Sequence, residues 1–318
     1  VDSESYDHAH LEDDTKVAII VPGLLYGSAS YEAMCADMTA RGYPAVIVPM
    51  EWWHWIPCLG GRGMRPVLER IDYTVDHVLE FGPEVPVPAP SYSVWDLLLD
   101  FLENPGGVLK VGGSSDPDEC QPAEPQGADF SAEARSRRGA ASEGRNRVAI
   151  VGHSAGGWIS RIFLSTSRYI GRAYNGAERV HSLVTLGSPH AVAEGVAFKN
   201  VEWLERNQAP WPRPVRCLAV GATGYQAKSS SDFTRNAYVF CGASPSDGIV
   251  DGDGVTPLFS AHAFPGAQLA KLEGITHAGD YPSVGPTAEL SRDRMEGRSW
   301  YGSPSALESW LLWLRGEP

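Results

Sequence analysis

The chain has 318 residues, of which 43% are hydrophobic and 20% are charged. This is globular composition and excludes disorder of the whole chain, and no run approaches the roughly 18 consecutive apolar residues of a transmembrane helix. The formal net charge of −13 repels phosphate backbones, so we expect no nucleic acid as a partner.

The first 14 residues are polar and acidic, begin without Met and carry no charged-then-apolar signal pattern, so we expect a processed N-terminus. Beyond them, solid apolar runs alternate with helical patterns. The runs predict buried strands at 16–21, 45–49, 147–151, 180–186 and 215–220. Apolar residues spaced by three and four predict helices at 28–41 and 65–81. This alternation predicts the α/β class, with a parallel sheet covered by helices on both faces.

The segment 82–146 interrupts the alternation. It contains a candidate apolar helix at 94–102, and its part 113–146 has no Val, Ile, Leu or Met. Such a segment cannot bury enough apolar surface to offset its ordering entropy. We therefore expect one domain spanning 1–318, with 82–146 as an insertion or lid region and 113–146 as a low-complexity surface segment.

The cysteines give no sign of a metal site. They are widely spaced, odd in number and form no C-x-x-C pair. The five are Cys35, Cys58, Cys120, Cys217 and Cys241. We expect free thiols, with one disulfide as the alternative, and no metal or other cofactor.

The most informative stretch is a Gly-x-Ser-x-Gly pattern at 152–156. It follows an apolar strand and precedes a helical pattern. A nucleophilic serine needs this sharp strand-to-helix turn, in which Gly152 and Gly156 allow close backbone approach and the helix N-terminus offers unpaired N–H groups. The pattern predicts Ser154 as a nucleophile.

This stretch resembles the nucleophile elbow of the α/β-hydrolase family. The resemblance covers roughly residues 16–314 outside the 113–146 segment. It implies the α/β-hydrolase fold, with an eight-stranded, mostly parallel sheet, and a Ser-Asp-His triad in that chain order. It also implies an oxyanion hole built from the N–H of Ala155 and that of Leu24, with Leu25 as the alternative. Pro22 stands where lipases commonly carry His.

A triad needs a carboxylate that orients the base. The acidic loop 246–257 follows the strand-like run 238–241, and its Gly-Asp-Gly-Val pattern favours Asp253, with Asp251 and Asp247 as alternatives. The loop lacks the spacing of a calcium site. His277 lies 24 residues later, before the final helix, which is the family's place for the base. His262 and His190 are the competing histidines.

Loops decide the substrate. The loop after the second strand holds Trp52, Trp53 and Trp55, which either cap the core or form an apolar wall over a large pocket. Leu25, Tyr26 and His190 are further candidates for substrate contact, with core packing as the alternative for Tyr26 and His190. We expect a lipophilic small-molecule ester as the partner, with transient contact at a membrane surface. The sequence does not indicate an oligomeric state.

Lipases and chlorophyllases are hydrolases of this kind, and the overall pattern is similar to lipase-like hydrolases of algae and cyanobacteria. An algal chlorophyllase would cleave the phytyl ester of chlorophyll and be located in the chloroplast, with the cytoplasm as the alternative. Ala155 departs from land-plant chlorophyllases, which carry Arg there. The alternative hypotheses are an acylglycerol esterase, an acyltransferase with the same triad, and a catalytically silent binding protein.

Overall fold

The structure is a computed structural model. It describes residues 17–89, 98, 147–193, 195, 198–207, 210–227, 233–244, 248–279 and 298–314. The 113–146 segment, most of the candidate helix 94–102, Cys120 and Asp247 therefore lie outside the described residues.

Six strands alternate with helices along the described chain. The strands are β1 (Ala18–Val21), β2 (Ala45–Ile47), β3 (Val148–His153), β4 (Val180–Leu186), β5 (Arg216–Thr223) and β6 (Gln268–Glu273). The α-helices are α1 (Glu32–Ala40), α2 (Ile56–Leu59), α3 (Arg65–Phe81), α6 (Ala155–Leu164), α7 (Lys199–Arg206), α8 (Phe233–Phe240), α9 (Leu258–Ala261) and α11 (Pro304–Leu314). Short 3₁₀ helices are η2 (Ser28–Tyr31), η3 (Trp52–Trp55) and η4 (Gly176–Glu178).

The six strands form one sheet in the order β2-β1-β3-β4-β5-β6, and every pairing is parallel. The chain moves outward from β1 to β2 and then returns to the other side of β1 with β3. The order reverses there, and in such sheets ligands bind beyond the carboxyl ends of the strands at the point of reversal. The loops after β1 and β3 meet at this point.

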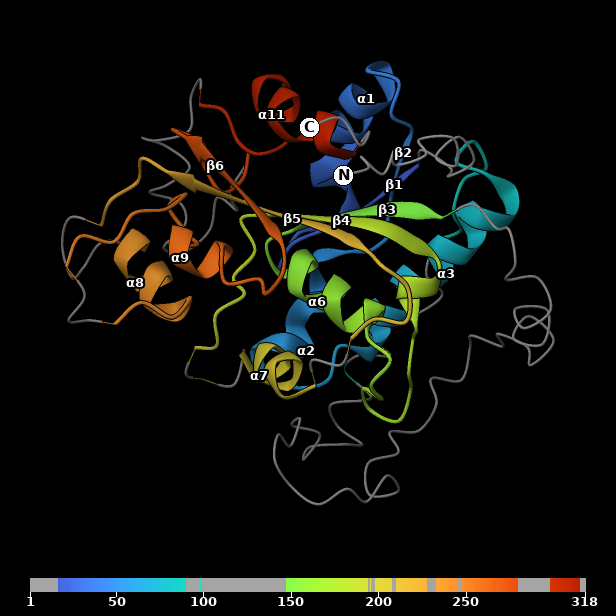
Figure 1. Ribbon diagram of the computed structural model, residues 1–318, viewed down its shortest axis with the longest axis horizontal. Coiled ribbons are helices and arrows are strands. Elements are labelled where there is room, and N and C mark those ends of the chain that lie inside the picture. The colour runs from blue at the N-terminus through green and yellow to red at the C-terminus, as the bar shows by residue number, and fades with distance from the viewer. Residues whose placement is uncertain are drawn as a thin grey trace, which may run out of the picture.

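Two hydrophobic cores cover the two faces of the sheet. Helices α1 and α11 lie on one face, where residues such as Ile20, Met34 and Trp310 are fully or almost fully buried (Figure 1). Helices α3, α6 and α7 lie on the other face, around residues such as Ile150 and Phe163. The predicted α/β class, with helices on both faces of a parallel sheet, is confirmed. No helix in the described ranges is long and apolar enough to cross a membrane.

Two details differ from the expectations. The described residues form six strands rather than the eight implied by the family resemblance. The strand-like run 238–241 belongs mainly to α8, which begins at Phe233. A short apolar run is compatible with a buried helix as well as with a strand. Here the element already begins at Phe233, and its greater length favours a helix.

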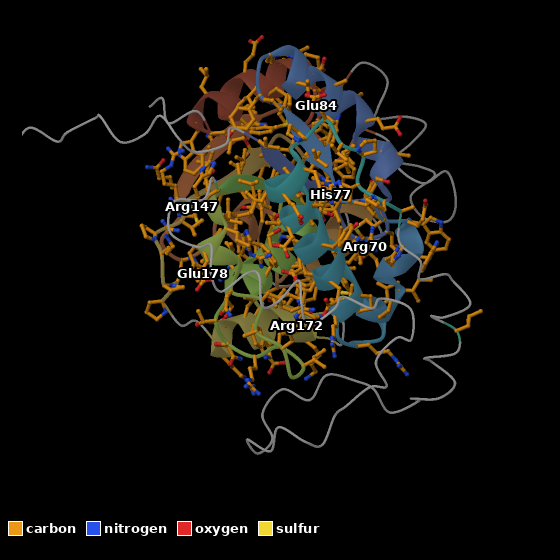
Figure 2. All side chains as sticks on the ribbon, turned by 90° about the vertical axis from the view of Figure 1, so that its right-hand side faces the viewer. Arg70, His77, Glu84, Arg147, Arg172 and Glu178 are labelled. Atoms are coloured by element: carbon orange, nitrogen blue, oxygen red, sulfur yellow. The ribbon has the colours of Figure 1, made fainter. Side chains whose placement is uncertain are left out.

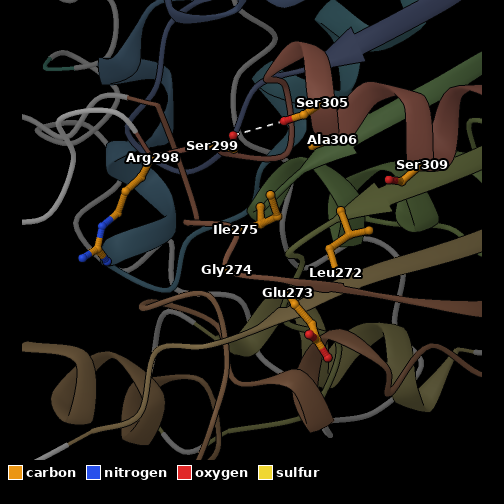
Figure 3. A pocket seen from close by; sticks show the side chains of 9 residues that line it. All are labelled: Leu272, Glu273, Gly274, Ile275, Arg298, Ser299, Ser305, Ala306 and Ser309. Atoms are coloured by element: carbon orange, nitrogen blue, oxygen red, sulfur yellow. Dashed lines mark hydrogen bonds between the residues drawn. The ribbon is translucent and has the colours of Figure 1, made fainter.

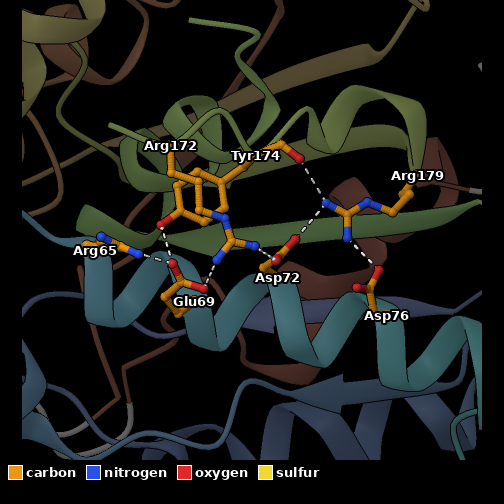
Figure 4. Close-up of polar contacts among 7 residues, drawn as sticks. All are labelled: Arg65, Glu69, Asp72, Asp76, Arg172, Tyr174 and Arg179. Carbon is orange, nitrogen blue, oxygen red and sulfur yellow. Dashed lines mark hydrogen bonds and ion pairs between the residues drawn. The ribbon is translucent and has the colours of Figure 1, made fainter. Parts of the chain in front are cut away.

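A partly buried ion-pair cluster connects α3 to the segment after α6 (Figure 4). Asp72, whose side chain is 4% exposed, accepts hydrogen bonds from Arg172 and from Arg179, the latter at 2.7 Å. Glu69 and Asp76 on the same face of α3 pair with Arg172 and Arg179 respectively. Figure 2 shows this side of the molecule, with Arg172 close to α3. Because α6 begins directly after Ser154, the cluster helps to hold the helix that carries the predicted nucleophile.

Candidate active site

Ser154 lies on a strained turn between β3 and α6. Its φ of 51° and ψ of −125° are unusual for a residue with a side chain. Its N–H donates to the carbonyl of Leu186 on β4 at 2.9 Å, which fixes the turn against the sheet. The side chain is therefore presented at the carboxyl end of β3, as a nucleophile elbow requires.

The two glycines of the pattern are required by close backbone contacts. A Cβ at Gly152 would lie 2.5 Å from the carbonyl oxygen of Gly156, and one at Gly156 would lie 2.3 Å from that of Val21. Both distances are well below van der Waals contact. The spacing of the motif thus lets α6 start directly over β3 and beside the end of β1.

Asp253 and His277 form a buried pair next to the elbow. His277 Nδ1 donates to Asp253 Oδ2 at 2.8 Å, and the N–H of His277 donates to the carbonyl of Asp253 at 3.0 Å. The two residues are 1% and 3% exposed. This hydrogen bond leaves the lone pair of His277 on Nε2, the atom that a general base needs.

The expected direct hydrogen bond between Ser154 Oγ and His277 is not found among the contacts of the described residues. Catalytic hydrogen bonds often tighten only when substrate is bound. The two residues are nevertheless connected through His153. This residue precedes Ser154 in the chain, and the centroid of its ring lies 4.8 Å from that of the His277 ring.

The competing acid and bases occupy other positions. Asp251 Oδ1 accepts the N–H groups of Gly224 and Gly252 at 2.7 and 2.8 Å, so it anchors its own loop. His262 Nε2 contacts the carbonyl oxygen of Ala270 on β6 at 3.0 Å, away from the elbow. Asp253, rather than Asp251, faces His277.

The loop after β1 lies directly against the elbow, as an oxyanion loop should. A Cβ at Gly23 would lie 2.8 Å from the Cβ of Ser154. A turn closed by Tyr26 N–H donating to the Gly23 carbonyl places Leu25 at a φ of 63°. Within the described chain, neither Leu24 nor Ala155 donates its N–H to a backbone carbonyl. Both predicted donors remain available for a developing negative charge.

His153 links this loop to the loop of His277. The N–H of Gly23 donates to the Tyr31 hydroxyl at 2.9 Å, that hydroxyl lies 2.6 Å from His153 Nδ1, and His153 Nε2 lies 2.7 Å from the carbonyl oxygen of His277. A carbonyl only accepts, so Nε2 carries the proton and Nδ1 accepts from Tyr31. Burial, reinforced by His277, lowers the pKa of His153 well below its usual value, which keeps the ring neutral.

The sequence analysis missed Tyr31 and Tyr301. The Tyr301 hydroxyl donates to Asp253 Oδ2 at 2.9 Å, and Tyr301 is fully buried. Trp300, its neighbour, packs edge-on against His153 with ring centroids 5.6 Å apart. The sequence signal that could have pointed to Tyr301 is the aromatic pair Trp300 and Tyr301 before the final helix. No spacing rule, however, connects this pair to residues near 153 and 253.

The three tryptophans of the candidate apolar wall have different environments. Trp52 is 53% exposed, and Trp53 is half-buried and stacks on His54 with ring centroids 3.8 Å apart. Trp55 is fully buried and packs edge-on against Trp158 of α6. Trp55 therefore belongs to the core, which was one of the two expectations for these tryptophans. The three side chains differ because the 3₁₀ turn of η3 points successive side chains in different directions. Only Trp52 and Trp53 reach the surface.

The remaining predicted contact residues are Leu25, Tyr26 and His190. Leu25 packs against the core while partly exposed, and Tyr26 lies edge-on to His153 at 6.0 Å. His190 is 4% exposed and contacts Arg161 and Thr185 rather than the elbow. The structure thus brings Leu25 and Tyr26, but not His190, to the turn that faces Ser154.

A cavity of about 490 Å³ lies behind the base loop, between the end of β6 and α11 (Figure 3). Its lining includes Ile275, two residues before His277, and the hydrogen-bonded pair Ser299 and Ser305. None of the predicted catalytic residues lines it. The described residues contain no group of three potential ligands that could hold a metal ion, and their cysteines Cys35, Cys58, Cys217 and Cys241 are free thiols.

Comparison with known proteins gives one family match. Residues 138–205 match the model of the PGAP1-like alpha/beta domain. That family has a hydrolase-type α/β fold. The matched part includes β3, the elbow, α6 and β4 and ends within α7. No curated protein matches the chain. The match agrees with the fold and with the position of the elbow, and it covers the nucleophile but not the acid or the base.

Proposed function

We propose that this protein is a serine carboxylic-ester hydrolase that acts on a bulky lipophilic ester. The observation that carries the proposal is the buried Asp253–His277 pair beside a serine on a strained elbow. In this mechanism His277 Nε2 takes the proton of Ser154 Oγ as the oxygen attacks the ester carbonyl. His277 then donates the proton to the leaving alcohol, and an acyl-enzyme remains for water to hydrolyse.

The loop after β1 and the start of α6 supply the electrostatic part of the mechanism. The N–H groups of Leu24 and Ala155 stabilise the oxyanion of the tetrahedral intermediate. Asp253 holds the His277 ring in the tautomer that can accept a proton and stabilises the imidazolium that follows. The chain from Gly23 through Tyr31 and His153 to His277 supports the proposal, since it connects the oxyanion loop and the base loop.

Covalent labelling tests the nucleophile. A fluorophosphonate probe should add once per chain to the wild-type protein and not to the Ser154→Ala variant. Turnover of a short soluble ester should fall by about 10⁴-fold or more in that variant. Labelling that survives in the variant, or a wild-type protein that is never labelled, would contradict the proposal. The second result would favour a binding protein with a hydrolase fold.

A panel of esters tests the substrate class. Exposed Trp52 supports a bulky apolar substrate, because burying apolar surface contributes roughly 25 cal/mol per Å². We propose the phytyl ester of chlorophyll as the specific substrate, with long-chain acylglycerols as the competing class. Cleavage of acylglycerols but not of chlorophyll would identify a lipase, and cleavage of short esters alone would refute both. An added alcohol that captures the acyl group in preference to water would identify an acyltransferase.

Trp52 and Trp55 provide a matched pair for the same test. Trp52→Ala should lower kcat/KM for long esters much more than for short ones, because it removes exposed apolar surface at the loop. Trp55→Ala should instead lower stability by about 3–5 kcal/mol, because it empties a core position. Equal loss on short and long esters in the Trp52→Ala variant would remove this loop from substrate binding.

A further inference from the structure

Arg161 on α6 is buried and forms no ion pair with another described residue. It is 6% exposed, and none of the ion pairs found in the described ranges includes it. Arg172 and Arg179, which are half-buried, each pair with two carboxylates. Burial lowers the pKa of Arg161 to about 10, so its guanidinium is still charged at neutral pH.

The groups that contact Arg161 are neutral. Arg161 Nη1 donates to His190 Nδ1 at 3.2 Å, and the guanidinium lies over the ring of Phe264 at 4.5 Å. Burial, and then Arg161 itself, lower the pKa of His190 well below its usual value. Burial also raises the pKa of the nearby Cys217 thiol to about 12. Neither group can supply a negative charge at neutral pH, and a buried cation without one is costly.

Arg161 lines a cavity of about 360 Å³ between α6, α7 and the loop after β4. Besides Arg161, His190 and Glu205, the lining residues have apolar side chains, and they include Val192, Val201 and Leu204. Glu205 lies on the lining as well. Its carboxylate acts to raise the pKa of Arg161, but Glu205 is exposed and makes no ion pair with Arg161. The cavity thus combines one cation without an ion pair, several apolar side chains and an acidic residue toward solvent.

We infer that this cavity binds an amphiphilic carboxylate, with its carboxylate on Arg161 and a short hydrocarbon chain against the apolar side chains of the lining. The planar guanidinium fork matches a carboxylate in two parallel hydrogen bonds. A single cation with an acidic neighbour at Glu205 favours a monoanion over a phosphate dianion. The cavity is separate from the nucleophile, since Arg161 follows Ser154 by seven positions, or about 10 Å along a helix.

Binding of octanoate to the full chain tests the inference. It is measured by calorimetry in the Ser154→Ala variant, so that the result does not depend on the proposed esterase activity. Octanoate should bind saturably, whereas octanol, which lacks the charge, and inorganic phosphate, which lacks the chain, should bind much more weakly. No saturable octanoate binding, or tighter binding of phosphate or octanol, would overturn the inference.

Substitutions then locate the site. Arg161→Gln keeps a donor for His190 but removes the charge, and should weaken octanoate binding about tenfold or more. Arg206→Gln, an exposed arginine of α7 that does not line the cavity, is the matched control and should leave binding unchanged. Equal affinity of the Arg161→Gln and wild-type proteins would overturn the inference.

Two surface variants keep the test decisive if Arg161→Gln does not fold. Glu205→Gln removes the acidic group from the lining and should tighten octanoate binding about twofold or more. Val192→Glu, at a residue that is 41% exposed, adds a negative charge to the same lining and should weaken it. Octanoate affinity that responds to neither change would place the ligand elsewhere.

Discussion

Replacing Asp253 by Asn should abolish catalysis without unfolding the protein. The Asp253 carboxylate accepts four hydrogen bonds. Its Oδ1 takes the N–H groups of Val255 and Thr256 at 2.9 and 2.7 Å, and its Oδ2 takes His277 Nδ1 at 2.8 Å and the Tyr301 hydroxyl at 2.9 Å. The two backbone groups can only donate. The carbonyl oxygen of the new amide must therefore occupy the Oδ1 position.

The NH₂ group of Asn then faces His277 Nδ1. Two donors cannot share that contact, so the His277 proton moves to Nε2 and the ring can no longer accept the proton of Ser154. The wrong tautomer in a triad costs about 10⁴-fold in kcat, which corresponds to about 5.4 kcal/mol of transition-state stabilisation. The size of the side chain is unchanged, so the urea midpoint should change far less than it would for a cavity-forming substitution.

The assay is steady-state hydrolysis of a short soluble ester, with urea unfolding of the same samples. Asp251→Asn is the matched control. Asp251 Oδ1 accepts Gly224 N–H and Gly252 N–H, and the amide oxygen of Asn can keep both, so this variant should retain kcat near the wild-type value. If Asp251→Asn loses turnover while Asp253→Asn keeps it, the reasoning about the acid is refuted.

Three further perturbations have expected outcomes. Tyr301→Phe removes a buried hydroxyl from a carboxylate and should lower the free energy of unfolding by about 1.5–3 kcal/mol in urea titrations, and no measurable loss would contradict the hydrogen bond. Gly156→Ala places a Cβ 2.3 Å from the Val21 oxygen and should destabilise the elbow by about 1–3 kcal/mol, with labelling by a fluorophosphonate slowed in parallel. Burial lowers the pKa of His153 and His190 in the folded state. Below about pH 6.5 the unfolded chain therefore binds more protons than the folded protein does, and the free energy of unfolding should fall with decreasing pH by up to about 1.4 kcal/mol per pH unit for each histidine. A pH-independent unfolding free energy between pH 6.5 and 4.5 would show that neither ring resists protonation.

Much of the core architecture could be read from local patterns. The runs at 16–21 and 147–151, each apolar after its first residue, predicted buried strands because only a sheet covered on both faces accepts uninterrupted apolar residues. The spacing of 65–81 predicted α3 with its observed bounds. Ser154 was identifiable because an elbow needs Gly152 and Gly156 within five residues, a requirement of the local backbone that is visible without the fold.

Other features depend on contacts between distant residues, which no local pattern encodes. Tyr31 and His153 are 122 positions apart, and His153 and His277 are 124 apart, so their hydrogen-bonded chain appears only when β1, β3 and the loop after β6 come together. The different exposures of Trp52 and Trp55 depend on which side of η3 meets α6.

The sequence by itself therefore determined the α/β class, the strand–elbow–helix unit and the residue types of an acid and a base. Tertiary structure decided that Asp253 rather than Asp251 meets His277, and that Arg161 is buried without an ion pair to any described carboxylate. The physical reason is that backbone geometry and apolar periodicity act over a few residues, whereas burial and pairing of charges depend on which segments the parallel sheet places side by side.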